Sequence, residues 1–242
     1  MKRIVYAGLL AMTLAISGWA QRADVVPPPV LVVTGNAEIL AVPDEATVRL
    51  GIVRQASSAQ AAQDQANAGA QEILDAVGKT GVRPQQIQTS RLTLTPIYAP
   101  RNPDGRDTPR IVAYNASNTV SVRLDNLALV GPVIDAGLKA GANQLEGVQF
   151  GLRNDLPSRE EALKQAVMEG RSKAQVMANA LNVKLGEVLE VSEGGVSVVP
   201  RGDFFPLSGR AAEFAAAPTP VSPGQLEIHA NVTIRYRISS MP

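Results

Sequence analysis

Several stretches of the chain alternate apolar and polar residues, the pattern of a strand with one covered face. The clearest are residues 45–56, 112–124 and 225–238. Shorter runs at 30–39, 87–98, 148–152 and 188–191 complete the predicted strands, and the first of them is expected to break near Gly35. In 112–124, one face carries Tyr114, Ala116, Asn118, Val120 and Val122, and the other carries Asn115, Ser117, Thr119, Ser121 and Arg123.

Three segments instead have apolar residues at helical spacing. The first is capped by Ser57 or Ser58 and runs to about Val77. The second starts after Asp125 or Asn126 and ends by Gly141. The third follows a predicted capping box of Ser158 and Glu161. Its apolar stripe is predicted to comprise Leu163, Ala166, Val167, Gly170, Ala174, Met177 and Leu181.

The order of these elements is β-β-α-β-β-α-β-α-β-β. Because strands and helices follow one another without a regular βαβ alternation, the order predicts an α+β fold. The two-faced strands predict a mainly antiparallel sheet with the helices packed on one face.

The first twenty residues have the features of a cleaved signal peptide. Lys2 and Arg3 precede an apolar run over residues 4–16, and small residues end at Ala20. Cleavage is therefore expected between Ala20 and Gln21. Residues 21–29 form a Pro-rich linker, and 30–240 form the folded domain. We expect the mature chain to have no transmembrane segment and to be periplasmic or secreted.

Composition excludes several kinds of chemistry. The chain of 242 residues has no cysteine, so thiolate nucleophiles, disulfides and Cys-ligated metal sites are ruled out. Its 23 basic and 22 acidic residues nearly balance, which does not favour nucleic acid as a partner. No cofactor, metal ion or catalytic residue is predicted.

Few single residues invite a functional interpretation. His229 is the only histidine and lies on the polar face of the last strand, with no Ser or carboxylate motif recognisably arranged to partner it. A structural role is favoured over a proton shuttle. Asn118 is a polar residue on an apolar face, for which a structural role is favoured over ligand contact. Glu160 and Glu161 are read as helix-start residues rather than a catalytic pair.

A long Pro-rich loop is expected over residues 194–224. It contains three of the four phenylalanines of the chain: Phe204, Phe205 and Phe214. Loops of this length are uncommon and often functional. The phenylalanines could cover the core of their own chain, contact another subunit or partner, or touch a membrane surface. We take them as the candidate interaction residues.

Several motifs together resemble the SIMPL-domain family of exported bacterial proteins. They are the runs 86–90 (QIQTS), 114–120 (YNASNTV) and 141–144 (GANQ), and the Ala-rich, charged segment 159–181 followed by Gly186. Some members are described as oxidative-stress defence or periplasmic immunogenic proteins. The resemblance implies an envelope location, ferredoxin-like sub-lobes and self-association. It transfers no catalytic residue.

Two functions remain open. The first is a non-catalytic envelope protein that works by binding or self-assembly, as a homo-oligomer or with an envelope protein, with at most an indirect link to oxidative stress. The second is a small-ligand carrier or enzyme that uses polar residues of the sheet face, such as Asn115, Ser117, Thr119, Asn231 and Arg235. A deep pocket with converging Arg, Asn and carboxylate groups would favour the second.

Overall fold

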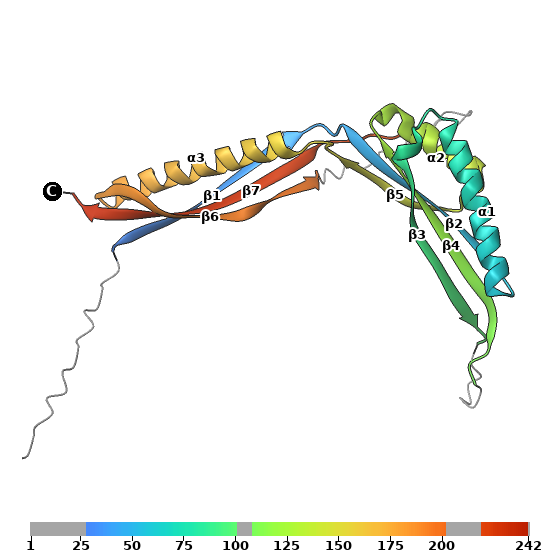
Figure 1. Cartoon of the computed structure of the whole chain (residues 1–242). Coiled ribbons are helices and arrows are strands. Elements are labelled where there is room, and N and C mark those ends of the chain that lie inside the picture. The colour runs from blue at the N-terminus through green and yellow to red at the C-terminus, as the bar shows by residue number, and fades with distance from the viewer. Residues whose placement is uncertain (1–27, 101–107, 202–218, 242) are drawn as a thin grey trace, which may run out of the picture.

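The fold consists of two lobes, each an antiparallel sheet with helices on one face (Figure 1). The computed structural model describes residues 28–100, 108–201 and 219–241. Over these residues the elements follow the predicted order, so the α+β prediction is confirmed. The elements are β1 (Val30–Ala41), β2 (Glu45–Ala56), α1 (Ala59–Gly78), η1 (Pro84–Gln86), β3 (Ile87–Tyr98), β4 (Ile111–Leu124), η2 (Leu127–Leu129), α2 (Val130–Lys139), β5 (Gln144–Gly151), α3 (Leu156–Ala180), β6 (Val183–Pro200) and β7 (Leu226–Ser240).

The first lobe joins elements from both ends of the described chain. Its three strands have the order β1-β7-β6, and β7 is the central strand. Thr34 of β1 pairs with Thr233 of β7, which pairs with Ser192 of β6. The helix α3 runs along one face of this sheet (Figure 1). The core of this lobe consists of alternate residues of β1 and β7 packed against small residues of α3.

The second lobe is formed by one continuous stretch of chain, from β2 to β5. Its strands have the order β3-β4-β2-β5. Both α1 and α2 pack on the same face, over Leu50, Ile52 and Val120. As predicted, Ser58 caps α1, and its hydroxyl accepts a hydrogen bond from the Ala61 amide. The opposite face of this sheet carries the polar residues of β4 and is not covered by a helix of the described chain.

Small residues allow α3 to pack closely on β1. The buried positions of α3 repeat every four residues and are Ala162, Ala166, Gly170, Ala174 and Ala178. A Cβ at Gly35 would lie 2.0 Å from the Ala166 carbonyl oxygen and 2.7 Å from the Gly170 nitrogen. The predicted stripe is therefore wrong in part, since Val167, Met177 and Leu181 are exposed. The helix lies too near the sheet for bulky side chains.

Other local predictions need correction. β1 continues through Gly35 without a break. Asp155, not Ser158, is the N-cap of α3, and its carboxylate accepts a hydrogen bond from Arg159 Nε at 2.6 Å. The last strand before the Pro-rich segment is much longer than predicted. Residues 194–200 belong to β6, and residues 195–200 pair with β7 from Asn231 to Leu226. The predicted loop therefore begins only after Pro200.

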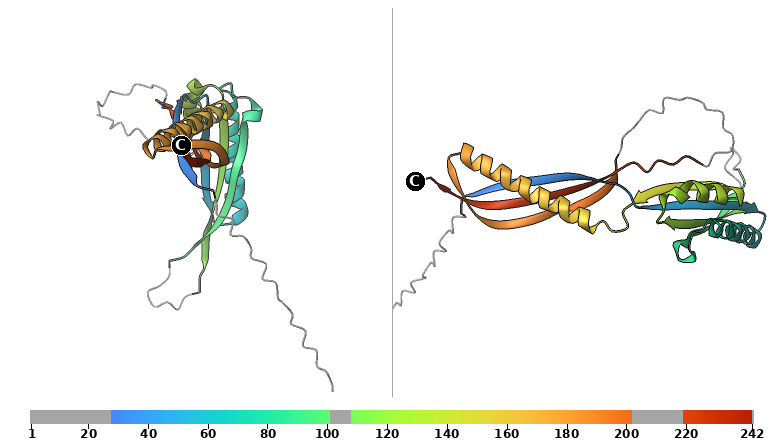
Figure 2. Two further views of the ribbon diagram at one scale, coloured as in Figure 1. Left: turned by 90° about the vertical axis from the view of Figure 1, so that its left-hand side faces the viewer. Right: turned by 90° about the horizontal axis from the view of Figure 1, so that it is seen from above.

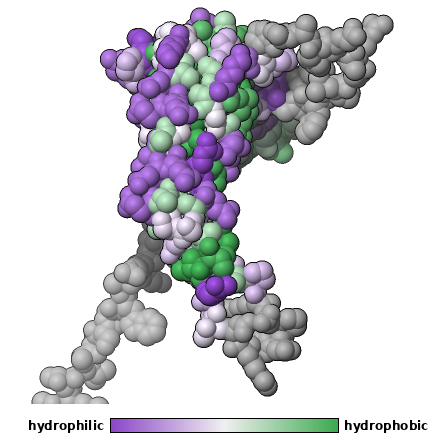
Figure 3. Space-filling model, turned by 90° about the vertical axis from the view of Figure 1, so that its right-hand side faces the viewer, coloured by the Kyte–Doolittle hydropathy of each residue, from purple (hydrophilic) through white to green (hydrophobic). Residues whose placement is uncertain are grey.

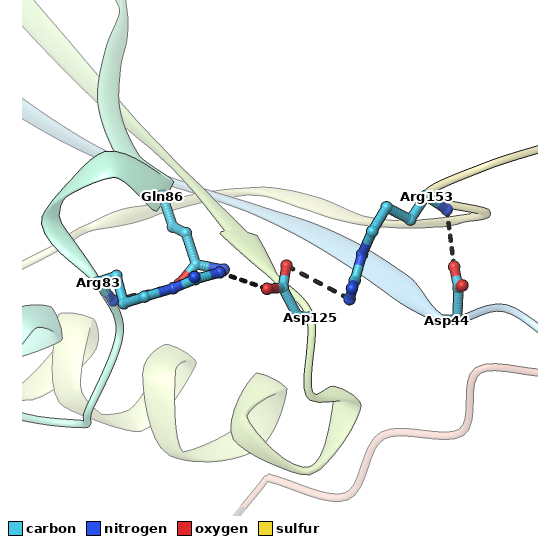
Figure 4. A network of polar contacts seen from close by, with 5 residues as sticks. All are labelled: Asp44, Arg83, Gln86, Asp125 and Arg153. Carbon is cyan, nitrogen blue, oxygen red and sulfur yellow. Dashed lines mark hydrogen bonds and ion pairs between the residues drawn. The ribbon is translucent and has the colours of Figure 1, made fainter.

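The lobes lie end to end at an angle (Figures 1 and 2), and the described residues cross between them at three places. Polar contacts fix two of these crossings, β1 to β2 and β5 to α3 (Figure 4). Asp44 Oδ1 accepts the Arg153 amide at 2.7 Å. The Arg153 side chain approaches Asp125 Oδ1 at 3.6 Å, and Arg83 binds the other oxygen of Asp125. The contacts anchor both crossings to the end of β4.

The third crossing is a strap formed by residues 219–225, which precedes β7 and docks on α2. The Thr219 hydroxyl donates to Asp135 Oδ1 at 2.6 Å, and its amide donates to Oδ2 at 3.3 Å. Val221 packs against the core of the second lobe. A Cβ at Gly131 would lie 2.6 Å from the Thr219 oxygen, so this glycine leaves room for the strap.

Docking of the strap is expected to weaken in acid. The Thr219 hydroxyl, aided by its amide and by Lys139, lowers the pKa of Asp135 against the opposing effect of burial. A carboxyl whose folded-state pKa is depressed stabilises the fold above its unfolded pKa of about 3.9 and loses that contribution as pH falls through the folded value. The melting temperature of Asp135→Asn should therefore lie below that of the unmodified chain at pH 7 and approach it below about pH 4.

Asp75→Asn is the matched control for this experiment, because Asp75 is also a helical carboxylate, and its side chain accepts a hydrogen bond from Gln71 of its own helix rather than from the strap. A gap between Asp135→Asn and the unmodified chain that stays constant from pH 7 to pH 3 would contradict the expectation.

Candidate functional site

The open face of the second lobe is hollowed into a broad depression of about 730 Å³. All four strands of the sheet contribute to it. Its lining is mostly hydroxyl and amide side chains with one ion pair and two apolar residues: Val53, Arg91, Thr93, Thr95, Asn115, Ser117, Gln144, Leu145 and Glu146. We refer to it as the sheet hollow.

Strand register sets the arrangement of polar groups in the sheet hollow. Thr93 of β3 lies opposite Ser117 of β4, and Thr95 lies opposite Asn115. Directly paired residues point to the same face of an antiparallel sheet. These four side chains therefore form a two-by-two grid of hydroxyl and amide groups.

The edge of the sheet hollow is built by the turn before β5. The Asn143 side chain pairs with the backbone of Val53 as a neighbouring strand would. Its Oδ1 accepts a hydrogen bond from the Val53 amide at 2.8 Å, and its Nδ2 donates to the Val53 oxygen at 3.0 Å. This continues the β2–β5 pairing beyond its last backbone pair, Gly51 with Gln144. The Gln144 side chain is held beside Gly51, where a Cβ would lie 3.1 Å from Gln144 Cβ.

An ion pair and a hydroxyl hold the one carboxylate of the sheet hollow. Glu146 Oε1 accepts a hydrogen bond from Thr119 Oγ1 at 2.8 Å. Arg91 Nη1 approaches the same oxygen at 3.8 Å. The two charges of the sheet hollow therefore offset one another, and Glu146 is fixed from two sides.

The polar residues proposed from the sequence do not form one site. Asn115 and Ser117 line the sheet hollow, and Thr119 is buried beneath Glu146. Asn231 and Arg235, by contrast, lie on β7 in the other lobe. There Asn231 Nδ2 donates to Asn36 Oδ1 at 2.7 Å, and Arg235 pairs with Glu190 at 3.3 Å. Grouping all five residues was wrong, because β4 and β7 belong to different sheets.

The sequence analysis missed seven of the nine lining residues, and three of these seven have a common local cause: Arg91, Gln144 and Glu146. Each lies near a register shift, at Thr89/Arg91 in β3 or at Arg49/Leu50 where β2 meets β5. Simple alternation fails there. The available signal was the 141–144 run, which was noted only as part of the family resemblance.

His229 has a carboxylate partner that the sequence analysis did not recognise. Its Nε2 lies 3.3 Å from Glu227 Oε2, two residues away on the same face of β7. Ser197 of β6 and Glu38 of β1 are its cross-strand neighbours. These residues lie beside a second depression of about 390 Å³ on the open face of the first lobe, whose lining includes His229 and Ser197.

Asn118 is buried between β4 and α1. Its Nδ2 donates to Asn67 Oδ1 at 3.4 Å, while its own Oδ1 is buried with no hydrogen-bond partner among the described residues. The bonded neighbour is a side chain rather than the backbone that such amides usually find. Asn118 faces the helix, so it is not part of the sheet hollow.

Apolar side chains are exposed along the β3–β4 hairpin. Leu92 and Leu94 of β3 lie on the helix side of the sheet, and Val112 lies at a register shift near the start of β4. The three side chains are 57%, 44% and 42% exposed. We call these three residues the hairpin patch. Figure 3 shows apolar colours gathered in this part of the molecule, next to the end of the hairpin.

Some predicted sites fall outside the described residues. These are Phe204, Phe205 and Phe214, and the cleavage position between Ala20 and Gln21. Among residues 28–100, 108–201 and 219–241, no group of three or more His, Asp and Glu side chains is placed to hold a metal ion. Within the same ranges, no helix combines the length and apolar character needed to span a bilayer.

The fold and its hollow sheet face define a two-lobed α+β protein with helices on one side of each antiparallel sheet. The chain belongs to the SIMPL family, described as a protein of unknown function (DUF541), whose model matches residues 31–236. This confirms the resemblance seen in the sequence.

Relatives cover most of this chain. A 26 kDa periplasmic immunogenic protein of Brucella melitensis is 32% identical over 95% of this chain and 93% of its own length. A protein of the same description from Brucella abortus shows the same values. The uncharacterized protein YggE of Escherichia coli is 31% identical over 75% of this chain and 73% of its own length.

Proposed function

We propose that this protein is a non-enzymatic component of the bacterial envelope that acts by binding or self-assembly. The observation that carries the proposal is the hairpin patch, because three large apolar side chains of one hairpin lie in water. Contiguous exposed apolar surface typically marks an interaction site. Among the described residues, β3 is also an edge strand of its sheet, and its outer side offers backbone groups for pairing beside the patch.

Export supports the same proposal. The Brucella relatives are described as periplasmic. The basic, apolar and small-residue pattern of the first twenty residues favours a signal peptide cleaved after Ala20. We propose that the mature chain begins at Gln21 in the periplasm. Any link to oxidative stress is proposed to be indirect, since the chain has no cysteine.

The double variant Leu92→Gln/Leu94→Gln should weaken self-association of the mature chain. Both side chains are more than two-fifths exposed, so the monomer should lose little stability, while a contact surface loses apolar burial of about 1.5–3 kcal/mol for each side chain. Light scattering coupled to size exclusion, over a range of concentrations, should show a shift toward the monomer.

Met168→Gln/Val176→Gln is the matched control. These two residues of α3 are 62% and 65% exposed and lie in the other lobe. An equal loss of association in both variants, or none in either, would count against the hairpin patch as the contact.

The sequence offers a second contact in Phe204, Phe205 and Phe214. Three phenylalanines left in water would forgo burial, so we propose that they contribute to a homo-oligomeric or partner contact. Truncating all three to Ala in the same assay separates the alternatives. A lower mass of the assembly with an unchanged melting temperature supports the contact. A large fall in melting temperature with an unchanged mass of the assembly assigns the phenylalanines to the core of their own chain.

A small-ligand carrier is the second candidate function, and the sheet hollow is the observation that favours it. Asn115, Arg91 and Glu146 converge there from three strands. The depression is broad rather than deep, which fits binding of an extended ligand better than enclosure of a small one.

A further inference from the structure

We propose that the sheet hollow binds a neutral oligosaccharide. The inference rests on the second of the two proposed functions, the small-ligand carrier, because it specifies what the carrier surface would recognise. The volume of about 730 Å³ lies within the range of ligand sites. Its lining, however, differs from the usual apolar pocket.

The charges of the sheet hollow do not suit an ionic ligand. Arg91 is the only cationic side chain in the lining and Glu146 the only anionic one, among the described residues. They face each other at 3.8 Å. An anion such as a phosphate or nucleic acid would meet one guanidinium already shared with a carboxylate. A cation would meet one carboxylate already bound by Thr119.

The remaining lining suits a ligand rich in hydroxyl and amide groups. Thr93, Thr95 and Ser117 can each donate and accept a hydrogen bond, and Asn115 and Gln144 carry amides that do both. Val53 and Leu145 add apolar surface beside these hydroxyl and amide groups. A neutral sugar chain presents donors and acceptors on every ring and small apolar faces between them.

Rigid placement of these groups favours binding over simple hydration. The grid of four side chains is fixed by β3–β4 pairing, and Glu146 is held by Thr119. The Asn143 side chain holds β2 in place through two hydrogen bonds to the Val53 backbone. Sites built on strands lose little freedom when they bind, so weak polar contacts can add up.

The test uses the mature chain and a β-1,4-linked N-acetylglucosamine tetramer as the probe, followed by two-dimensional NMR of backbone amides. Saturable shifts confined to residues around the sheet hollow are expected. Thr93→Val/Thr95→Val keeps the strand shape but removes two hydroxyls, and it should weaken binding by about ten-fold. Thr34→Val/Thr233→Val removes two paired hydroxyls from the first lobe and should leave binding unchanged.

Other results would overturn the inference. Shifts that do not saturate, or that survive unchanged in Thr93→Val/Thr95→Val, would show that the grid does not bind the sugar. Tighter binding of tetraethylene glycol or of a blocked neutral tetrapeptide at the same amides would overturn the ligand class. If the chain does not bind the sugar but still self-associates through the hairpin patch, only this inference is refuted. If the chain neither binds the sugar nor self-associates, the proposed function is refuted as well.

Discussion

Gly35→Ala is expected to destabilise the first lobe by about 3 kcal/mol, despite adding only a methyl group. The new Cβ would lie 2.0 Å from the Ala166 oxygen and 2.7 Å from the Gly170 nitrogen. Both are backbone atoms, so no side chain can rotate away and α3 itself must move. That movement would open the packing along the Ala and Gly stripe, at a cost that exceeds the gain of about 0.4–1 kcal/mol from restricting the unfolded chain. Urea titration followed by circular dichroism measures the change.

Gly151→Ala provides the control for this substitution. Gly151 also lies in a strand, but a Cβ there would meet nothing within 4 Å. Its free energy of unfolding should change by less than about 0.5 kcal/mol. Similar losses in the two variants would mean that close packing against α3 does not explain the effect.

Val232→Asp is expected to cost about 3 kcal/mol or more, because it places a carboxyl in the core of the first lobe. Val232 is 2% exposed and lies in the central strand, beside the residues that contact α3. The sequence analysis had predicted that alternate residues of this strand face a covered side, and their burial confirms it. Denaturant titration at pH 7 gives the loss directly.

The neighbouring Thr233→Asp tests the direction of the side chain. Thr233 points to the open face, where Arg235 lies two residues away and its own partners across the sheet are Thr34 and Ser192. A loss below about 1 kcal/mol is expected there. If Thr233→Asp proves more costly than Val232→Asp, the two faces of β7 have been assigned in reverse.

Alternation of apolar and polar residues was enough to predict the elements and their faces. β2 and β3 have the predicted bounds, and the polar row of β4 from Asn115 to Arg123 lies opposite the helices as expected. Such patterns report what lies above and below a strand. They do not report which strand lies beside it, so the division into two sheets, with β1 paired to β7 across most of the sequence, could not be predicted.

Two further failures have local physical causes. The run Ser192-Glu193-Gly194-Gly195 has the composition of a turn, yet its backbone groups pair with β7, with a register shift between Glu193 and Gly195. In α3 the small residues of the predicted stripe are buried but its bulky members Val167, Met177 and Leu181 are exposed, because the near approach of Gly35 selects small ones. Register shifts also explain why the edge of the sheet hollow was not predicted, since bulges displace Arg91 and Glu146 from simple alternation.

The central position of β7 constrains the order in which the two lobes can form as the chain emerges from the ribosome or from a translocation channel. The second lobe is contiguous, so β2 to β5 can pair as soon as they have appeared. β1 and β6, by contrast, pair only with β7, which appears last of the elements. β1 must therefore wait, unpaired and carrying apolar residues such as Leu31 and Val33, until synthesis is almost complete. We expect this interval to be the time when the chain is most exposed to chaperones and proteases. Premature termination before residue 226 should leave one folded lobe attached to two strands, β1 and β6, that have no pairing partner.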